Sequence, residues 1–515
     1  MKNRFLHLLT LALVSSFAGM AQPLTMSQLD TLTEKYVRAS YNDLYTFLSL
    51  PNNSRIDGHI QPNIDWLQKA FTQRGFSVEV LPTKGKNPLV FAEHKADKTP
   101  AGKLKTLLFY MHFDGQPVQP ADWQQASPFT PVLKAKGENG TWQPIPWEKL
   151  QTTYNRTDGS REWRIFGRSS SDDKGPIVML LTALTALQQE HIPIPYNIKV
   201  ILDSEEEVGS PHLADAVGQY KNKLQADFMM IMDGGRHLSN QPTLIYGARG
   251  IASVTLTTYG PRGAQHSGHY GNYAPNPALR LTQLLGSMKD EDGRVTIPGY
   301  YDGITIDASV ARILAAVPDD PALIQQTIGV TVPDKVGRTY QEALQYPTLN
   351  IRGLSSAHVG VQAGTIIPDK AIAELDLRLV PESDPQRLIR LIRQHIEQKG
   401  YHIIDHEPTD ADRLQYPKLI QMRAAVGSLP FRTEFGGLED QWLTQAMKRA
   451  FGREPIKIRT MGGTVPIAPF IRTLNIPAIH VPMVNLDNNQ HAANENLRLG
   501  NYLEGIKTWL AIFTE

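Results

Sequence analysis

The chain has 515 residues, more than one hydrophobic core usually holds, so at least two domains are expected. Its 41% hydrophobic and 20% charged content is that of a globular protein and excludes a disordered or membrane-embedded chain. A net charge of +1 argues against nucleic acid and anionic membrane surfaces as partners, and the lack of cysteine excludes disulfides and thiolate metal ligands.

Residues 1–21 have the three-part layout of a secretory signal peptide. Lys2 and Arg4 precede an apolar run from Phe5 to Val14, and small residues follow up to Ala21. A buried N-terminal helix is the alternative. No later stretch reaches the ~18 apolar residues of a membrane helix. We therefore expect an exported protein without a membrane anchor, periplasmic in a Gram-negative host and otherwise secreted.

From about residue 25 to 245, apolar runs of strand length alternate with segments of helical length. Thr106–Met111, Ile198–Leu202 and Phe228–Met232 are apolar on both faces, as buried strands are. Pro176–Gln189 has the length and character of a buried helix. This alternation predicts an α/β domain whose sheet has helices on both faces. The same pattern returns near Asp440.

The middle of the chain has a different character. Ile251–Tyr259 is rich in Thr and Val, Ala371–Val380 alternates strictly, and Asp384–Lys399 is amphipathic with helical spacing. These features predict a smaller α+β domain, inserted into the first, whose sheet has one solvated face. The expected boundaries are 22–247 and 426–515 for the α/β domain and 248–425 for the inserted domain.

Acidic residues follow three predicted strands, at Asp114, Asp203 and Asp233. The carboxyl ends of strands in an open α/β sheet are where ligands bind. His112 and Asp114 lie two positions apart at a strand end, so both side chains point to the same side. One can then bind a metal while the other orients the imidazole ring by a hydrogen bond. Alone, such a pair is more often a surface feature.

Each of three further polar segments could bind a metal, but taken alone each also fits an ordinary structural role. Ser171-Asp172-Asp173-Lys174-Gly175 also fits a helix N-cap. Glu205-Glu206-Glu207 is a set of carboxylates that repel one another unless cations or protons offset them, but it also fits an acidic helix start. His491, in a loop, is by itself more often a solvent-exposed residue. Together, the segments offer histidines and carboxylates for two Zn²⁺ or Mn²⁺ ions, with one carboxylate left as a base.

These segments, in this order, resemble the motifs of the dinuclear zinc exopeptidase family that includes carnosinase and other dipeptidases, carboxypeptidase G, aminoacylase and succinyl-diaminopimelate desuccinylase. The resemblance runs from about residue 30 to the C-terminus and is greatest to the carnosinase-like dipeptidase branch. It implies that Asp114 orients His112 and that Glu206 is the general base. It also implies two metal sites, with the ligands His112, Asp172 and Asp233 for one ion and His491, Asp172 and Glu207 for the other.

The resemblance further implies an α/β catalytic domain with a mixed sheet and an inserted α+β domain that serves as lid and dimerisation surface. His266 would reach across a homodimer to stabilise the oxyanion. The residues that would hold the substrate are Thr365, Arg378, Gly463 and Thr464. Four positions depart from the family pattern, which puts substrate preference in question: Met111 and Ser169 replace Gly, Gly115 replaces Val, and Thr464 replaces Ser.

We therefore expect an exported, dinuclear metal-dependent peptidase that hydrolyses dipeptides or short peptides with a free carboxylate. Metal-bound hydroxide would attack and Glu206 would act as general base. Zn²⁺ is expected ahead of Mn²⁺. One alternative is an N-acyl amino acid amidohydrolase, a deacylase with the same metal site. A more remote alternative is a catalytically silent binding protein.

Overall fold

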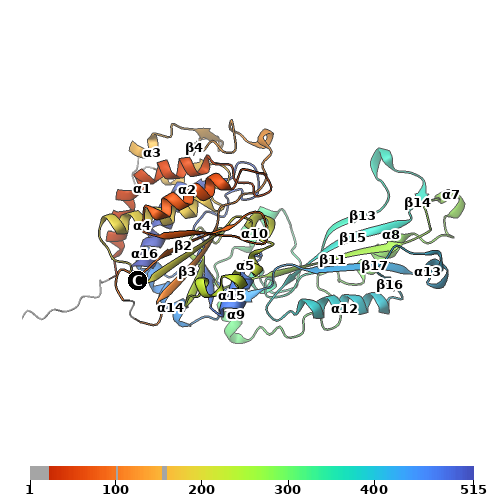
Figure 1. Ribbon diagram of the computed structural model, residues 1–515. Helices are drawn as coiled ribbons and strands as arrows, with labels where there is room; N and C mark the ends of the chain where they lie inside the picture. The colour runs from red at the N-terminus through yellow and green to blue at the C-terminus, as the bar shows by residue number, and fades with distance from the viewer. Residues whose placement is uncertain (1–22, 100–101, 153–158) are drawn as a thin grey trace, which may run out of the picture.

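The computed structural model describes residues 23–99, 102–152 and 159–515. The predicted signal peptide, 1–21, lies outside them. Figure 1 shows a helix-rich body on one side and an elongated extension on the other. In the described part of the chain, no helix has both the length and the apolar character needed to cross a membrane.

The body is built on an eight-stranded mixed sheet. Its strands, in spatial order, are β1 (Ser77–Leu81), β2 (Leu89–His94), β7 (Asn197–Asp203), β3 (Thr106–His112), β8 (Phe228–Ile231), β20 (Ala478–His480), β9 (Thr243–Ile245) and β19 (Ile456–Ile458). The central strands β7, β3, β8 and β20 are parallel, whereas β1 and β2 run antiparallel at one edge. The predicted mixed α/β sheet is confirmed.

Helices cover both faces of this sheet. Successive residues of β3 point to opposite sides of the sheet, so this strand contributes to a hydrophobic core on each face. Leu107, Phe109 and Met111 belong to one core cluster, and Leu108 and Tyr110 to another. The first cluster is covered by α1 (Met26–Leu48), α2 (Gln61–Thr72), α4 (Lys174–Gln189), α14 (Leu438–Phe451) and α16 (Leu499–Phe513). The second is covered by α5 (Leu213–Gln219), α6 (Lys221–Leu224) and α15 (Ala468–Leu474).

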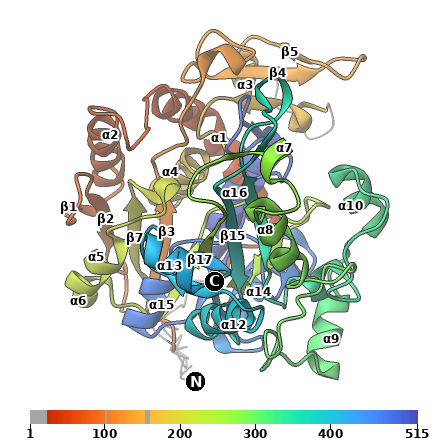
Figure 2. The ribbon, with the colours of Figure 1, turned by 90° about the vertical axis from the view of Figure 1, so that its right-hand side faces the viewer.

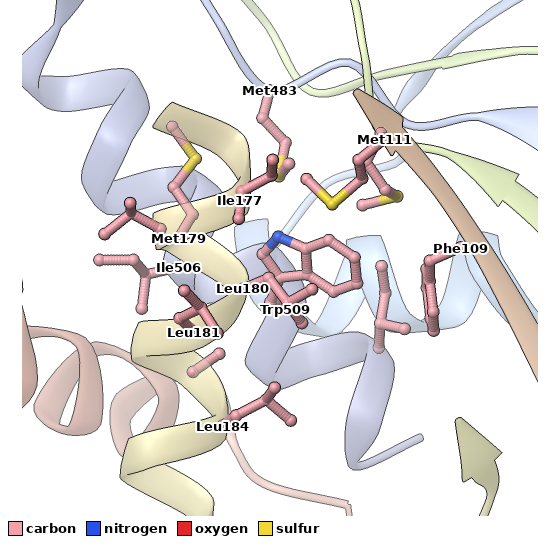
Figure 3. Packing of buried hydrophobic residues seen from close by; sticks show 14 of the residues in the cluster. Phe109, Met111, Ile177, Met179, Leu180, Leu181, Leu184, Met483, Ile506 and Trp509 are labelled. Atoms are coloured by element: carbon pink, nitrogen blue, oxygen red, sulfur yellow. The ribbon is translucent and has the colours of Figure 1, made fainter. Parts of the chain in front are cut away.

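Part of the first cluster packs behind the end of β3. Figure 3 shows Trp509 of α16 between Phe109 and Met111 of β3 and Leu180 of α4. All four side chains are fully buried, and the Phe109 and Trp509 ring centroids are 4.8 Å apart. Burying an aromatic side chain of this size stabilises the fold by about 2–3 kcal/mol. This packing fixes the strand that ends at His112.

The extension, here called the lid, is a five-stranded sheet with helices on one face. Its strands, in order, are β13 (Asn350–Ser355), β15 (Lys370–Leu379), β11 (Gly250–Tyr259), β17 (Leu419–Val426) and β16 (His402–Ile404). The helices α8 (Pro277–Gly286) and α12 (Pro385–Gln398) pack on it through residues such as Leu284, Leu388 and Ile392. Along β15 buried residues alternate with partly exposed ones, as expected for a sheet with one covered face.

The lid joins the body where β10 (Gly247–Ala248) pairs with β18 (Phe431–Arg432). At its far end, β12 (Gln265–His266) pairs with β14 (Ile366–Ile367) beside α7 (Ser267–Tyr270); these residues are called the lid tip (Figure 1). A four-stranded sheet lies on the body, with β21 (Asn496–Arg498), β6 (Arg164–Phe166), β4 (Val132–Lys136) and β5 (Trp142–Pro144).

One stretch of the inserted region turns back to the body. Val317 packs against Ile245, Ile456 and Ile458 of the eight-stranded sheet. This stretch holds α9 (Ala308–Ala315), α10 (Pro321–Ile328) and α11 (Tyr340–Ala343). The expected boundaries, 22–247, 248–425 and 426–515, stay a prediction. The remaining short helices are α3 (Lys149–Thr152), α13 (Asp410–Gln415), η1 (Pro120–Asp122), η2 (Ser160–Glu162), η3 (Glu206–Val208) and η4 (Gly360–Gln362).

Candidate metal centre

The predicted metal ligands meet at the carboxyl edge of the central parallel strands. His112 is the last residue of β3, and Asp233 follows β8, its parallel neighbour. Asp172 lies in the loop before α4, Glu207 in η3 after β7, and His491 in the loop before β21. Neighbouring parallel strands end at the same edge of the sheet, so residues more than 100 positions apart in the sequence face one another there.

Asp172 lies between two histidines. Its Oδ1 is 2.7 Å from His112 Nε2, and its Oδ2 is 3.1 Å from His491 Nε2, which is also 3.1 Å from Glu207 Oε2. Two groups of potential ligand atoms result, and within each group all atoms lie within 4.8 Å of one another. One group is His112, Asp172 and Asp233, and the other is Asp172, Glu207 and His491. Asp172 is common to both, as a bridging carboxylate must be.

These residues fit two divalent cations. Among the described residues, no group donates a hydrogen bond to the buried Asp233 Oδ1, and the buried Asp172 Oδ2 has the partly exposed His491 ring nitrogen at 3.1 Å. A buried carboxylate oxygen without a partner is costly, and a cation placed among such oxygens supplies the missing interaction. Imidazole and carboxylate donors without thiolates suit Zn²⁺ or Mn²⁺.

The crowding of charge shifts several pKa values. Contacts with Asp172 and Glu207 raise the pKa of His491 to about 10. Burial and the charge of Asp172 raise the pKa of Asp233 to about 6. Burial, together with the charges of Asp233, Asp172 and Glu207, raises the pKa of Glu206 well above its usual value. The His491 shift reflects its attraction to carboxylates, whereas the Asp233 and Glu206 shifts reflect burial and the repulsion among carboxylates that bound cations would relieve.

Asp114 ties the end of β3 to the acidic segment. Its Oδ1 is 3.4 Å from His112 Nδ1. Its carboxylate accepts hydrogen bonds from the backbone N–H of Glu206 (3.1 Å) and of Glu207 (3.2 Å). This fully buried carboxylate therefore sets the direction of the His112 ring and the position of η3.

Glu495 organises the loop that carries Asp172, a function that sequence reasoning missed. It is fully buried and accepts hydrogen bonds from the Arg168 guanidinium, from the backbone N–H of Ser169, Ser171 and Asp172, and from the Ser171 hydroxyl. The only signal in the sequence was its place four residues after His491.

Asn52 connects the two ligand loops and explains two of the departures from the family pattern. Its Nδ2 donates to the Phe113 carbonyl (2.8 Å) and to Ser169 Oγ (2.9 Å). A Cβ on Gly115 would lie 2.5 Å from Ser169 Oγ and 2.9 Å from Asn52, so no larger residue fits there. Gly115 and Ser169 are therefore complementary. Gln116, also missed, donates to Glu207 Oε2 at 2.6 Å.

The predicted substrate residues form two separate groups. Arg378 donates to Thr464 Oγ1 at 2.8 Å, where the lid joins the body, with Gly463 beside Thr464. His266 is exposed at the lid tip, where the Ser267 N–H donates to the Thr365 carbonyl at 2.9 Å. Figure 1 shows this tip at the end of the lid remote from the eight-stranded sheet, and in Figure 2 that end of the molecule faces the viewer. Within one chain, His266 and Thr365 are therefore not brought to the metal ligands.

The fold is typical of a metal-dependent hydrolase, and so is a carboxylate shared by two groups of potential ligands that each contain one histidine. A sequence profile of peptidase family M20/M25/M40 matches residues 108–515, and the protein belongs to this family, so it is a hydrolytic enzyme of the peptidase class. The predicted resemblance is thereby confirmed.

Relatives with named activities match most of the chain. The Cys-Gly metallodipeptidase dug1 of Schizosaccharomyces pombe is 27% identical over 431 residues, 82% of this chain and 81% of that protein. The human Beta-Ala-His dipeptidase is 27% identical over 436 residues, covering 83% and 77%. Among solved structures, the M20 family metallo-carboxypeptidase Sso-CP2 of Sulfolobus solfataricus is 26% identical with a TM-score of 0.73, covering 92% of this chain and 98% of that one. Human carnosine dipeptidase 1, at 23% identity and a TM-score of 0.72 over 96% and 99%, shares the fold.

Proposed function

We propose that the protein is an exported dipeptidase that uses two divalent metal ions, Zn²⁺ ahead of Mn²⁺. The observation that carries this proposal is the position of Asp172 between His112 and His491, with Glu206 beside the cluster. The named activities of the two relatives above, both dipeptidases, support dipeptides as substrates. Bound divalent ions would polarise the scissile carbonyl and lower the pKa of the attacking water.

Glu206 is proposed as the general base. It lies among the candidate ligands, and no described residue donates a hydrogen bond to its carboxylate. Its own backbone N–H is held by Asp114, which fixes the residue without occupying the carboxylate. Glu206 is thus available to take a proton from water and to deliver it to the leaving nitrogen.

The pair of Arg378 and Thr464 is proposed to bind the free carboxylate of the substrate. The Arg378 side chain is about one-third exposed, with Asp376 at 3.8 Å as its acidic neighbour. The planar guanidinium can bind a carboxylate through two parallel hydrogen bonds. The backbone of Gly463, next to Thr464, would hold the substrate beside this pair.

A homodimer is proposed to complete the site with His266 and Thr365 of the second subunit. The lid edge strand β13 exposes Ile351 (43%) and Leu354 (54%), and the loop after it exposes Val359 and Val361. An apolar exposed edge of this kind is suited to contact another chain. Such a contact would explain why His266 lies far from the metal ligands of its own chain. Export rests on the predicted signal peptide.

The test is metal-dependent hydrolysis by the mature protein without residues 1–21. The protein is stripped of metal, Zn²⁺ or Mn²⁺ is added back, and turnover is measured on dipeptides and on N-acyl amino acids. Metal-dependent cleavage of dipeptides is the expected result. Cleavage of only the acylated compounds would identify a deacylase, and metal binding without turnover of either would identify a silent binding protein.

A further inference from the structure

A short segment of the inserted region, Gln345–Thr348, contacts both halves of the proposed carboxylate site. Arg378 belongs to β15 of the lid, whereas Thr464 belongs to the loop after β19 of the body. Their side chains meet at 2.8 Å, so this contact depends on how the strand and the loop are held relative to each other. Gln345 holds the loop of Thr464, and Thr348 holds the strand of Arg378.

Gln345 holds the loop that carries Thr464. Its side chain is 2% exposed, and its Oε1 accepts hydrogen bonds from Arg459 Nη1 (2.5 Å) and from Thr460 Oγ1 (3.2 Å). Arg459 and Thr460 are themselves buried. Both donors point to one oxygen, so Gln345 fixes the backbone just before the substrate-binding residues of this loop.

Thr348 holds the strand that carries Arg378. Its N–H donates to the Arg378 carbonyl at 3.0 Å, and its Oγ1 accepts from the Arg378 N–H at 3.0 Å. The hydroxyl of Tyr300, which is 1% exposed in the lid core, donates to the Thr348 carbonyl at 2.8 Å. The end of β15 is therefore fixed by the same segment that fixes the loop.

The segment is anchored to the body on the side of the metal ligands. Gln341 donates to Asp319 Oδ2 at 3.0 Å, and His237 Nε2 donates to Asp319 Oδ1 at 3.0 Å. His237 follows Asp233 by four residues. Gln345 Nε2 completes this series of hydrogen bonds by donating to the Gln341 carbonyl at 3.1 Å. A continuous run of hydrogen bonds thus connects the loop of a candidate metal ligand with the loop of Thr464.

We propose that Gln345 is a positioning residue for recognition of the substrate carboxylate. This inference depends on the proposed function of Arg378 and Thr464. Gln345 touches Arg459 and Thr460, and through them it keeps Thr464 within reach of Arg378. Loss of its oxygen leaves two buried donors unpaired, which shifts the loop and weakens binding of the carboxylate.

The test compares Gln345→Leu with Gln345→Glu in the metal-loaded enzyme. Leu removes the acceptor, whereas Glu keeps an acceptor for Arg459. Gln345→Leu should raise KM for a dipeptide about tenfold, with kcat changed less than about twofold and metal content unchanged. Gln345→Glu, which keeps the acceptor but loses the donor to the Gln341 carbonyl, should keep KM nearer to the wild-type value than Gln345→Leu does. Gln421→Leu, at a buried glutamine of β17 outside this network, is the matched control and should leave KM unchanged.

A second substrate separates positioning from a general structural effect. For the corresponding dipeptide amide, which has no free carboxylate, Gln345→Leu should leave KM unchanged. An equal change for dipeptide and amide, or a wild-type KM in Gln345→Leu while Arg378→Lys raises it, would overturn the inference. If Gln345→Leu does not fold, Thr460→Val removes one of the two donors and should raise KM in the same selective way.

The failure of the proposed function gives a different result. If the wild-type enzyme cleaves only N-acyl amino acids, dipeptidase activity is refuted, and the KM comparison is made on those compounds, which also carry a carboxylate. Absence of turnover on both classes overturns the proposed function and the positioning inference together.

Discussion

The metal-ligand cluster and the lid tip differ in how completely one chain organises them. Asp172 and His112 are buried, and the loops around them are fixed by hydrogen bonds that Glu495 and Asp114 accept and that Asn52 donates. His266 is exposed on a two-residue strand. A single chain therefore pre-organises the candidate metal ligands, whereas the histidine proposed to act on the oxyanion lies remote from them in its own chain and is proposed to act on a second subunit. Substitutions in each of the two regions test this difference.

Glu206→Gln should lower kcat by about 10²–10⁴-fold, because a neutral amide cannot accept the proton from water. Bound metal should be unchanged, since Glu206 is not among the candidate ligands. Steady-state kinetics and elemental analysis measure both. Glu205→Gln is the matched control, because Glu205 accepts from Asn87 outside the ligand groups and should have a small effect. Activity retained in Glu206→Gln would refute the assignment of the base.

His266→Ala should lower kcat by about 10²-fold, the cost of losing one oxyanion donor. His269→Ala is the control, because its ring is a neighbour of His266, with centroids 4.6 Å apart, and should leave kcat near the wild-type value. Mixing His266→Ala with Glu206→Gln subunits should restore activity that neither variant has alone. Such a mixed dimer has one site with an intact base and an intact partner histidine. Failure of the mixture to regain activity would contradict the cross-subunit arrangement.

Glu495→Gln should weaken metal binding by about 10–100-fold, because Glu495 holds the loop of Asp172 without being a ligand. An amide in its place turns an N–H donor toward the backbone N–H groups of the loop and removes the charged partner of Arg168. Chelator competition measures the affinity, and Glu454→Gln, at an exposed glutamate, is the control. Unchanged affinity would show that the loop is organised without this carboxylate.

Metal affinity should rise with pH by about tenfold per unit for each proton released. The pKa of His491 is raised to about 10 in the metal-free protein, and a ligating imidazole must be neutral. Below that pH a metal ion must displace the proton, so affinity falls as pH falls and levels off above about pH 10. Proton release on titration with Zn²⁺ at neutral pH, followed in a weak buffer, checks the sign. Proton uptake, or no release, would contradict it.

Much of the fold could be predicted from local patterns. The run Thr106–Met111 became β3, Thr106–His112, and Pro176–Gln189 became α4, Lys174–Gln189, because a strand or helix buried on all sides is apolar throughout. The turn of the inserted region back to the body was not predicted. Val317 packs on the eight-stranded sheet through a contact that has no local signature.

The candidate site was predictable in its ligands and unpredictable in its supports. His112, Asp172, Glu207, Asp233 and His491 stand in motif order, and the structure brings them together. Asn52 and Gln116 carry no comparable signal, because polar residues of these types are common in loops and only their partners reveal a role. For Glu495 the sequence showed its place after His491 but not its hydrogen bonds to the loop of Asp172.

Local patterns were enough to show which chemistry is available: histidines and carboxylates without thiols, placed at strand ends where neighbouring parallel strands meet. Only the tertiary structure decided that Asp172 lies between two histidines, that Arg378 of the lid meets Thr464 of the body, and that His266 lies at the remote lid tip. The physical reason is that residue types and periodicity are local properties. Contacts between residues tens to hundreds of positions apart depend on strand order and on side-chain packing, which no local pattern encodes.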